Sequence, residues 1–218
     1  MDSSTDGVAK APALKPTTAA LSDAELMAYL GAPGVAAEGR FFPDTYAYSR
    51  GVSDLTVLKR AFKAMQKRLD AAWGQRREGL PLKNADEALI LASIVEKETG
   101  SPADRALVAA VFINRLKLGM PLQTDPTVIY GLGESFDGNL RRRDLLADTA
   151  FNTYTRGGLP PTPIAMPGRA ALLAAVRPDA SHALYFVSRG DGSSEFSETL
   201  AEHNRAVNLY QRGGQRGR

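Results

Sequence analysis

Two glutamates lie two positions apart in the segment IVEKETG, residues 94–100, directly after the apolar run ALILAS. A carboxyl group surrounded by apolar side chains favours its neutral form, and a neutral carboxyl can act as a proton donor. In a helix, residues two positions apart point about 200° away from each other, so Glu96 and Glu98 cannot face the same cleft. We therefore expect at most one of them to do chemistry.

The neighbouring residues favour Glu98, because positions three and four apart share one face of a helix. The face that ends at Glu98 carries Leu91, Ile94 and Val95. The face that ends at Glu96 carries Leu89, Ala92 and Ser93. The first face is the more apolar, which makes Glu98 the better candidate for a general acid. The alternative is a helix end whose two charges simply lie in solvent.

The composition argues against most other catalytic chemistry. The chain has no cysteine, which removes disulfides, thiolate zinc sites and a cysteine nucleophile. His182 and His203 are its only histidines and have no partner at metal-ligand spacing, so we expect no metal. GxSxG, P-loop and GxGxxG motifs are absent, so we expect no serine triad and no nucleotide cofactor. Acid catalysis by a carboxylate is the simplest enzymatic option that remains.

The charge balance argues against a nucleic-acid partner. The 218 residues include 27 basic and 24 acidic ones, a formal net charge of +3, and much of the excess lies in the tail at 211–218. The expected helix after Ser53 has a basic face, which we interpret as a solvated surface, with binding of an acidic polymer as the alternative. That face consists of Lys59, Arg60, Lys63, Lys67 and Arg68. No signal peptide is visible, and no apolar run approaches the roughly 20 residues that span a bilayer.

The periodicities predict an α+β fold, in which helices pack with a small β-sheet. Residues 1–20 are interpreted as a linker or cloning remnant, 21–83 as a small helical and extended lead-in region, 84–211 as the catalytic domain and 212–218 as a disordered basic tail. Helices are expected after Ser22, after Ser53 and from about 86 to 100. Further helices are expected after Ser101-Pro102, after Asp125-Pro126, over 168–176 and over 199–211, with a β-hairpin across ALYFVS, RGDG and SEFS.

Five segments, in this order, resemble the YceG-like (MltG) family of endolytic murein transglycosylases. They are EGRFFPDTY at 38–46, ASIVEKET at 92–99, VFINRLKLGMPLQTDPTVIYG at 111–131, FNTYTRGGLPPTPIAMPG at 151–168 and LYFVSRGDGSSEFSETLAEHN at 184–204. The resemblance implies the catalytic fold of that family, together with cleavage of the β-1,4 bond between N-acetylmuramic acid and N-acetylglucosamine. It implies that no water is consumed and that a 1,6-anhydromuramoyl end is formed.

The resemblance also implies roles for individual residues. The family's catalytic acid is the second glutamate of EKE, which is Glu98 here. One carboxylate can suffice, because the substrate's own C6 hydroxyl replaces the water or nucleophile that other glycosidases need. Glu96 is then a structural or supporting residue, and Glu38 is a further carboxylate of unassigned role.

We nominate polar residues in the family motifs for binding the glycan. They are Gln123, Thr124, Asp125, Asn152, Thr153 and Tyr154. For two of them a structural role stays open, with Asp125 as a helix cap and Asn152 as a turn residue. A set of aromatic residues could stack on sugar rings or pack in the core. These are Phe41, Phe42, Tyr46 and Tyr48.

The sequence departs from the family pattern at its N-terminus, where members carry a transmembrane helix and a LysM-like domain that this chain lacks. Phe151 also stands where tyrosine is common. The resemblance implies action on peptidoglycan strands at the periplasmic face of the bacterial inner membrane, with peptidoglycan polymerases as candidate partners. The competing hypothesis is a non-catalytic module that binds glycan and recruits cell-wall synthesis proteins.

Overall fold

Helices dominate the computed structural model, which describes residues 13–212, and one antiparallel pair of strands accompanies them. The α+β prediction is therefore confirmed. The helices in chain order are α2 (Asp23–Tyr29), α3 (Asp54–Trp73), α4 (Ala85–Glu98), α5 (Arg105–Lys117), α6 (Asp125–Leu132), the short η1 (Gly133–Ser135), α7 (Arg142–Leu146), α8 (Arg169–Val176), α9 (Leu200–Val207) and the π-helical turn η2 (Asn208–Arg212). Residues 1–12 of the predicted linker and 213–218 of the predicted tail lie outside the described residues.

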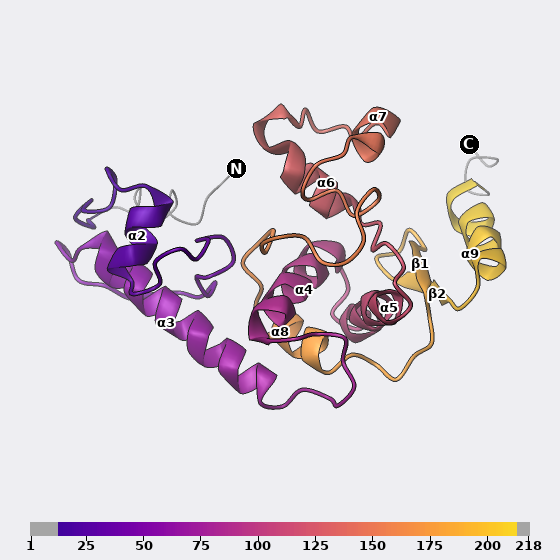
Figure 1. Ribbon diagram of the computed structural model, residues 1–218, viewed down its shortest axis with the longest axis horizontal. Coiled ribbons are helices and arrows are strands. Elements are labelled where there is room, and N and C mark those ends of the chain that lie inside the picture. Colours follow the sequence, from indigo (N-terminus) through magenta and orange to yellow (C-terminus); the bar gives the residue numbers. More distant parts are fainter. Residues whose placement is uncertain (1–12, 213–218) are drawn as a thin grey trace.

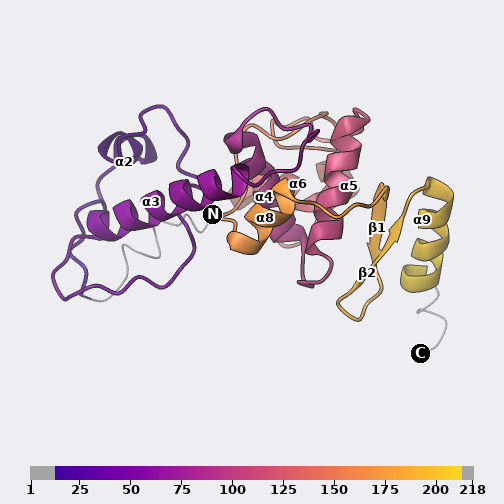
Figure 2. The same cartoon turned by 90° about the horizontal axis from the view of Figure 1, so that it is seen from below.

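The elements follow one another along an elongated body (Figures 1 and 2). α2 and most of α3 form one end, α4, α5 and α8 form the middle, and the hairpin with α9 forms the other end. α6 and α7 lie together on one side of the middle part, above α4 in Figure 1. The helix α4, whose last turn carries both glutamates, therefore lies in the middle part of the molecule.

Local capping signals decide where the first two helices begin. The Ser22 side chain accepts the Glu25 amide and the Glu25 carboxylate reaches back to Ser22, which is the predicted capping box. The Ser53 side chain accepts the Leu55 amide at the start of α3. The first half of α3 packs with α2 in a small core, and its second half belongs to the main core. The small core consists of Leu26, Met27, Ala37, Phe41, Leu58, Ala61 and Phe62.

Residues 13–18, inside the predicted linker, bind back onto the start of α3 through Asp54. The fully buried Asp54 carboxylate accepts the amide and hydroxyl of Thr17, at 3.0 and 2.6 Å, and those of Thr18, at 3.1 and 2.8 Å. Burial alone would raise the pKa of Asp54, but the hydrogen bonds from Thr17 and Thr18 outweigh it and lower the pKa to about 2. This part of the N-terminal segment is therefore attached to the folded chain.

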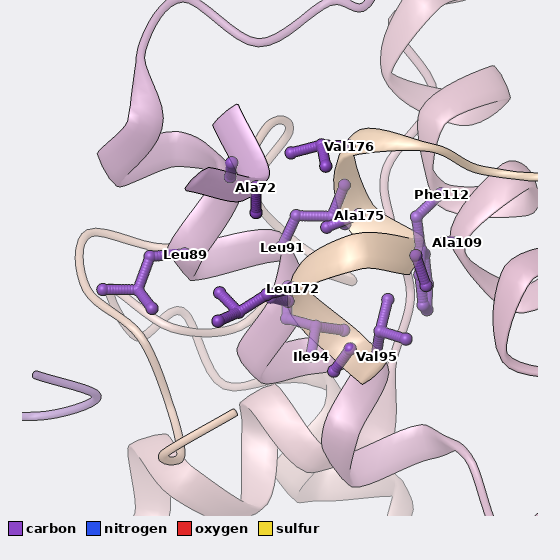
Figure 3. Packing of buried hydrophobic residues seen from close by; sticks show 14 of the residues in the cluster. Ala72, Leu89, Leu91, Ile94, Val95, Ala109, Phe112, Leu172, Ala175 and Val176 are labelled. Atoms are coloured by element: carbon purple, nitrogen blue, oxygen red, sulfur yellow. The ribbon is translucent and has the colours of Figure 1, made fainter. Parts of the chain in front are cut away.

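The main core surrounds α4, which packs against α8, α5 and α3 (Figure 3). Both faces of α4 are buried, the one that leads to Glu98 and the one that leads to Glu96. Leu89, Leu91, Ala92, Ser93, Ile94 and Val95 are all 0% exposed. The more apolar composition of the face that leads to Glu98 therefore does not mean that this face is more buried than the other.

Three predicted boundaries differ from the structure. α5 begins at Arg105 instead of after Ser101-Pro102, because Asp104 closes a turn onto Ser101 and its carboxylate accepts the Ser194 amide of the hairpin. α6 includes Asp125 as its first residue, with Thr124 before it. The closing helix is α-helical only to Val207 and continues as the π-helical turn η2.

The hairpin is confirmed as predicted. β1 (Tyr185–Ser188) pairs antiparallel with β2 (Ser194–Ser197), with Phe186 opposite Phe196. α9 packs against both strands. Within residues 13–212, no helix combines the length and the apolar character that crossing a bilayer requires.

Candidate active site

Glu98 is the last residue of α4 and lies partly buried at the point where the chain leaves the helix. The helix ends there because Thr99 is extended and directs both its amide and its hydroxyl to the Val95 carbonyl, at 3.1 and 2.7 Å. Glu98 Oε1 accepts a hydrogen bond from the Thr124 hydroxyl at the start of α6. Two segments distant in sequence therefore meet at this carboxyl group.

The surroundings of Glu98 favour its protonated form. Burial raises the pKa of Glu98, and the nearby negative charge of Asp125 raises it further, whereas the Thr124 hydrogen bond acts in the opposite direction. The C-terminal position in α4 also disfavours a negative charge, because the helix dipole is negative at that end. A carboxyl group with a raised pKa is suited to donating a proton.

Thr124 is held in place by a buried network of hydroxyl groups. It stands at the N-cap position of α6 but makes no capping bond with its side chain, which binds Glu98 instead. Its amide donates to the Thr153 hydroxyl at 3.1 Å, and its carbonyl accepts the Thr127 hydroxyl at 2.7 Å. The hydroxyls of Thr127 and Thr153 lie 2.9 Å apart. The three threonines are at most 2% exposed, so Thr124 and Thr153 position the site from inside the protein.

Gln123 is exposed and has an unusual backbone conformation. Its φ of 52° lies in the left-handed region, which residues other than glycine rarely adopt. Two contacts hold it there: its amide donates to the Thr153 carbonyl at 3.1 Å, and its side-chain oxygen accepts from Arg115 at 3.3 Å. Strain of this kind is common at functional sites.

Asp125 and Tyr154 form a pair beside Glu98. The Tyr154 hydroxyl donates to Asp125 Oδ1 at 2.6 Å, and Asp125 is exposed as the first residue of α6. Burial raises the pKa of Tyr154, and the Asp125 carboxylate raises it further, so the phenol stays protonated. The predicted capping role does not fall to Asp125, because Thr124 occupies the N-cap position.

Asn152 lies inside the loop and not at its surface. Its side chain is 0% exposed and donates to the carbonyls of Asp144, Leu145 and Ala147, at 3.3, 3.0 and 2.7 Å. Its side-chain oxygen accepts the Tyr154 amide at 2.8 Å. All polar atoms of this side chain are therefore engaged within the protein, and no surface of it is available to a sugar.

Glu96 points to a different part of the protein from Glu98. Its Oε2 accepts the Gly168 amide at 2.9 Å, directly before α8. Gly168 is the N-cap residue of α8, and its amide is one of the donors at the helix start that have no acceptor within the helix. Glu96 therefore caps a core helix, a contact that fits the structural role expected for it.

Glu38 binds the opposite end of α6 from Glu98. Its Oε2 accepts the Tyr130 hydroxyl at 3.3 Å, six residues beyond Thr124 or about 9 Å along the helix. Burial raises the pKa of Glu38, and burial with the nearby Glu38 charge raises the pKa of Tyr130 to about 12. The Tyr130 ring packs on Phe151, with ring centroids 4.8 Å apart. Phe151 thus contributes packing against Tyr130.

The aromatic side chains of the lead-in region mostly pack within it. Phe41 and Phe42 are 2% and 7% exposed and belong to the two cores. The Tyr46 hydroxyl donates to the Phe42 carbonyl at 2.8 Å, and Arg60 lies over its ring. Tyr48 is exposed. Core packing therefore accounts for Phe41 and Phe42, which leaves no aromatic platform formed by all four.

Two polar side chains near the site, those of Thr127 and Arg115, were not among the predicted residues. Arg115, on α5, is 7% exposed and donates to the carbonyls of Pro121 and Leu122, directly before Gln123. The available signal was a cation placed among the apolar positions of α5.

Within residues 13–212, no group of three or more histidine, aspartate or glutamate side chains is arranged to hold a metal ion.

Comparisons with known proteins identify similar chains. The YceG-like family matches residues 4–209. The chain is 39% identical over 175 residues to a protein named endolytic murein transglycosylase from Bacillus subtilis, covering 79% of this chain and 48% of that protein. A protein of the same name from Streptococcus pneumoniae is 31% identical over 177 residues, covering 78% of this chain and 31% of its own length.

The fold has a counterpart in a crystal structure. A yceG-like protein from Listeria monocytogenes superposes with a TM-score of 0.66 at 36% sequence identity, covering 77% of this chain and 54% of that one. The chain thus spans about half or less of the length of the relatives it matches. With a family match over nearly its whole length and a shared fold, the chain belongs to the YceG-like family.

Proposed function

We propose that this chain is a lytic transglycosylase that cleaves the glycan strands of peptidoglycan, with Glu98 as its acid and then its base. Relatives from two organisms carry the name endolytic murein transglycosylase. The observation that supports Glu98 is its environment, a partly buried carboxyl with a raised pKa that accepts one hydroxyl and lies beside an exposed polar pair. Glu96 has no comparable surroundings, because it caps α8.

The reaction that we propose needs one carboxyl group. Protonated Glu98 gives its proton to the oxygen between N-acetylmuramic acid and N-acetylglucosamine, and the bond from that oxygen to the anomeric carbon breaks. The C6 hydroxyl of the muramic acid forms a new bond to the same carbon and gives its proton to the Glu98 carboxylate. The acid is restored, no water is consumed, and the products are a 1,6-anhydro end and a free C4 hydroxyl.

Exposed and partly exposed polar residues around Glu98 form the proposed sugar-binding surface. Gln123, Asp125 and Tyr154 offer an amide, a carboxylate and a phenol hydroxyl, which suit the hydroxyl and acetamido groups of the glycan. Thr124, Thr153 and Asn152 are buried and act by positioning these groups.

We place this reaction outside the cytoplasm, where murein lies. We further propose that the protein acts at the periplasmic face of the inner membrane, held by an N-terminal anchor, and that peptidoglycan polymerases are its partners. These last points rest on the family resemblance described above.

Mass spectrometry of digested glycan strands tests the proposal. Uncrosslinked strands are incubated with the protein, with the Glu98→Gln variant and with the Glu96→Gln variant as a matched control. We expect fragments with 1,6-anhydro ends from the protein and from Glu96→Gln, and none from a folded Glu98→Gln. Fragments heavier by one water would indicate hydrolysis instead. Binding of strands that stay uncut would favour the glycan-binding module.

A further inference from the structure

Arg115 joins three separate parts of the chain. Its Nε donates to the Leu184 carbonyl at 2.7 Å, directly before β1. Its Nη1 donates to the carbonyls of Pro121 and Leu122, at 3.1 and 3.0 Å, and to Gln123 Oε1 at 3.3 Å. One guanidinium on α5 thereby holds the hairpin and the segment that leads to Thr124.

No carboxylate compensates this buried charge. In the part of the chain that the structure describes, Arg115 has no ion-pair partner, and its hydrogen bonds go to uncharged oxygens. Its guanidinium lies 5.1 Å from the centre of the Tyr185 ring, on which His203 stacks. Burial lowers the pKa of Arg115. A buried cation without a counterion is costly, so its position calls for an explanation beyond packing.

The segment that Arg115 holds is the one that carries the strained backbone. Gln123 has a φ of 52° and lies directly before Thr124, whose hydroxyl binds Glu98. Because Arg115 binds the two preceding carbonyls and the Gln123 side chain, it resists relaxation of this backbone. If the segment relaxed, the Thr124 hydroxyl would move relative to Glu98.

We propose that Arg115 is a positioning residue for the catalytic acid: it fixes residues 121–123 and thereby holds the Thr124 hydroxyl on Glu98. The proposal rests on the proposed function, in which Glu98 is that acid. It acts through hydrogen bonds. The pKa of Glu98 is affected by the neutral Thr124 hydroxyl and by the charge of Asp125, and the titratable Tyr154 interacts with the Glu98 charge, whereas the charge of Arg115 acts on Tyr154 and His203.

The direction of the expected effect follows from the chemistry of the bond. The Thr124 hydroxyl stabilises the Glu98 anion and holds the pKa of Glu98 below the value that burial alone would give. Loosening residues 121–123 should therefore raise the pKa of Glu98 further, by about one unit for loss of one hydroxyl-to-carboxylate bond. The basic limb of the pH profile of kcat/KM should shift to higher pH by the same amount, while the maximum rate falls because the acid is less well aimed.

Arg115→Lys is the informative variant, because lysine keeps the charge and loses the planar arrangement of donors. The pKa of Glu98 is measured by carbon NMR of the carboxyl group, assigned with Glu98→Gln, in the wild type, Arg115→Lys, Thr124→Val and the double variant. We expect a rise of about one unit in each single variant and no further rise in the double variant, because both changes remove the same contact. Additive shifts, or an unchanged pKa in Arg115→Lys, would overturn the proposal.

Asn114→Ala provides the matched control. Asn114 neighbours Arg115 on α5, and its side chain donates to the Ser181 and Ala183 carbonyls before the hairpin, at 2.8 and 3.0 Å, and not to the carbonyls of Pro121 and Leu122 that Arg115 binds. It should lower thermal stability and leave the Glu98 pKa unchanged. If Asn114→Ala raised the pKa of Glu98 as much as Arg115→Lys does, any weakening of the contacts between α5 and the hairpin would have the same effect. That result would contradict a specific role for Arg115.

Two further measurements test the proposal if a variant does not fold or if the protein does not cleave glycan strands. If Arg115→Lys fails to fold, the wild type provides the test: the Arg115 Nη–H resonances, whose donors hold residues 121–123, should follow the Glu98 titration and lose this response in Glu98→Gln, and wild-type resonances without this response would overturn the proposal. The NMR titration needs no turnover. Uncut glycan strands would therefore count against the proposed function alone, and an unmoved Glu98 pKa against Arg115 alone.

Discussion

Replacement of Glu96 should lower the stability of the protein and leave its catalytic activity unchanged. We expect the reverse for Glu98. The Glu96 carboxylate accepts the Gly168 amide at 2.9 Å, one of the donors at the start of α8 that have no acceptor within the helix. α8 packs against α4, α5 and α3, so a weakened helix start affects the main core. Loss of a capping acceptor costs about 1 kcal/mol, with a further few tenths from loss of the charge near the helix N-terminus.

The Glu96→Ala variant should therefore lose about 1 kcal/mol, or about 2 to 4 °C in Tm for a chain of this length. Glu96→Gln keeps an oxygen acceptor and should lose less. Urea unfolding and turnover of glycan strands, measured on the same preparations, separate the two effects. A Glu96→Gln protein with unchanged stability and abolished turnover would refute the assignment of the two glutamates.

Three further predictions concern residues around the site and the N-terminal segment. Because the pKa of Asp54 is about 2 in the folded protein against 3.8 ordinarily, its contribution of about 2 kcal/mol is present above pH 4 and is lost as the pH falls towards 2. Urea unfolding across this range should show that loss in the wild type and not in Asp54→Asn. Asn152→Ala should cost about 2 kcal/mol or more in urea unfolding, since it removes the four hydrogen bonds of a fully buried side chain, and an unchanged stability would contradict its structural role. Tyr154→Phe removes the bond to exposed Asp125 and should raise KM for glycan strands about 3- to 10-fold with little change in Tm; an unchanged KM would remove Tyr154 from the binding surface.

The sequence predicted best what local chemistry decides. The capping box of Ser22 and Glu25, the Ser53 cap and the hairpin all depend on residues a few positions apart, and the structure contains each of them. The start of α5 was missed because the Asp104 carboxylate binds Ser194, ninety positions away. Such a contact leaves no trace in the spacing near Ser101.

The candidate site shows the same division. The angle between positions two apart correctly separated Glu96 from Glu98, since their carboxylates bind different segments. The comparison of apolar faces had less value than expected, because both faces of α4 are completely buried. The Gly168 and Thr124 contacts distinguish the two glutamates, and neither could be found from local spacing.

Burial also divides the nominated binding residues into two groups. Gln123 and Asp125 are exposed, whereas Asn152 is enclosed by carbonyls of its own loop. A polar residue in a motif looks the same in sequence whether it faces a ligand or closes a loop. Arg115 was overlooked for a related reason: three of its partners are backbone carbonyls, which the sequence does not reveal, and its placement among the apolar positions of α5 was the only signal.

The most direct test of the central claim is the product mass from purified glycan strands treated with the wild-type protein and with Glu98→Gln. The account predicts 1,6-anhydro ends, with no water added, from the wild type and no cleavage by a Glu98→Gln protein that keeps its fold. Full cleavage by Glu98→Gln, or wild-type products heavier by one water, would contradict it.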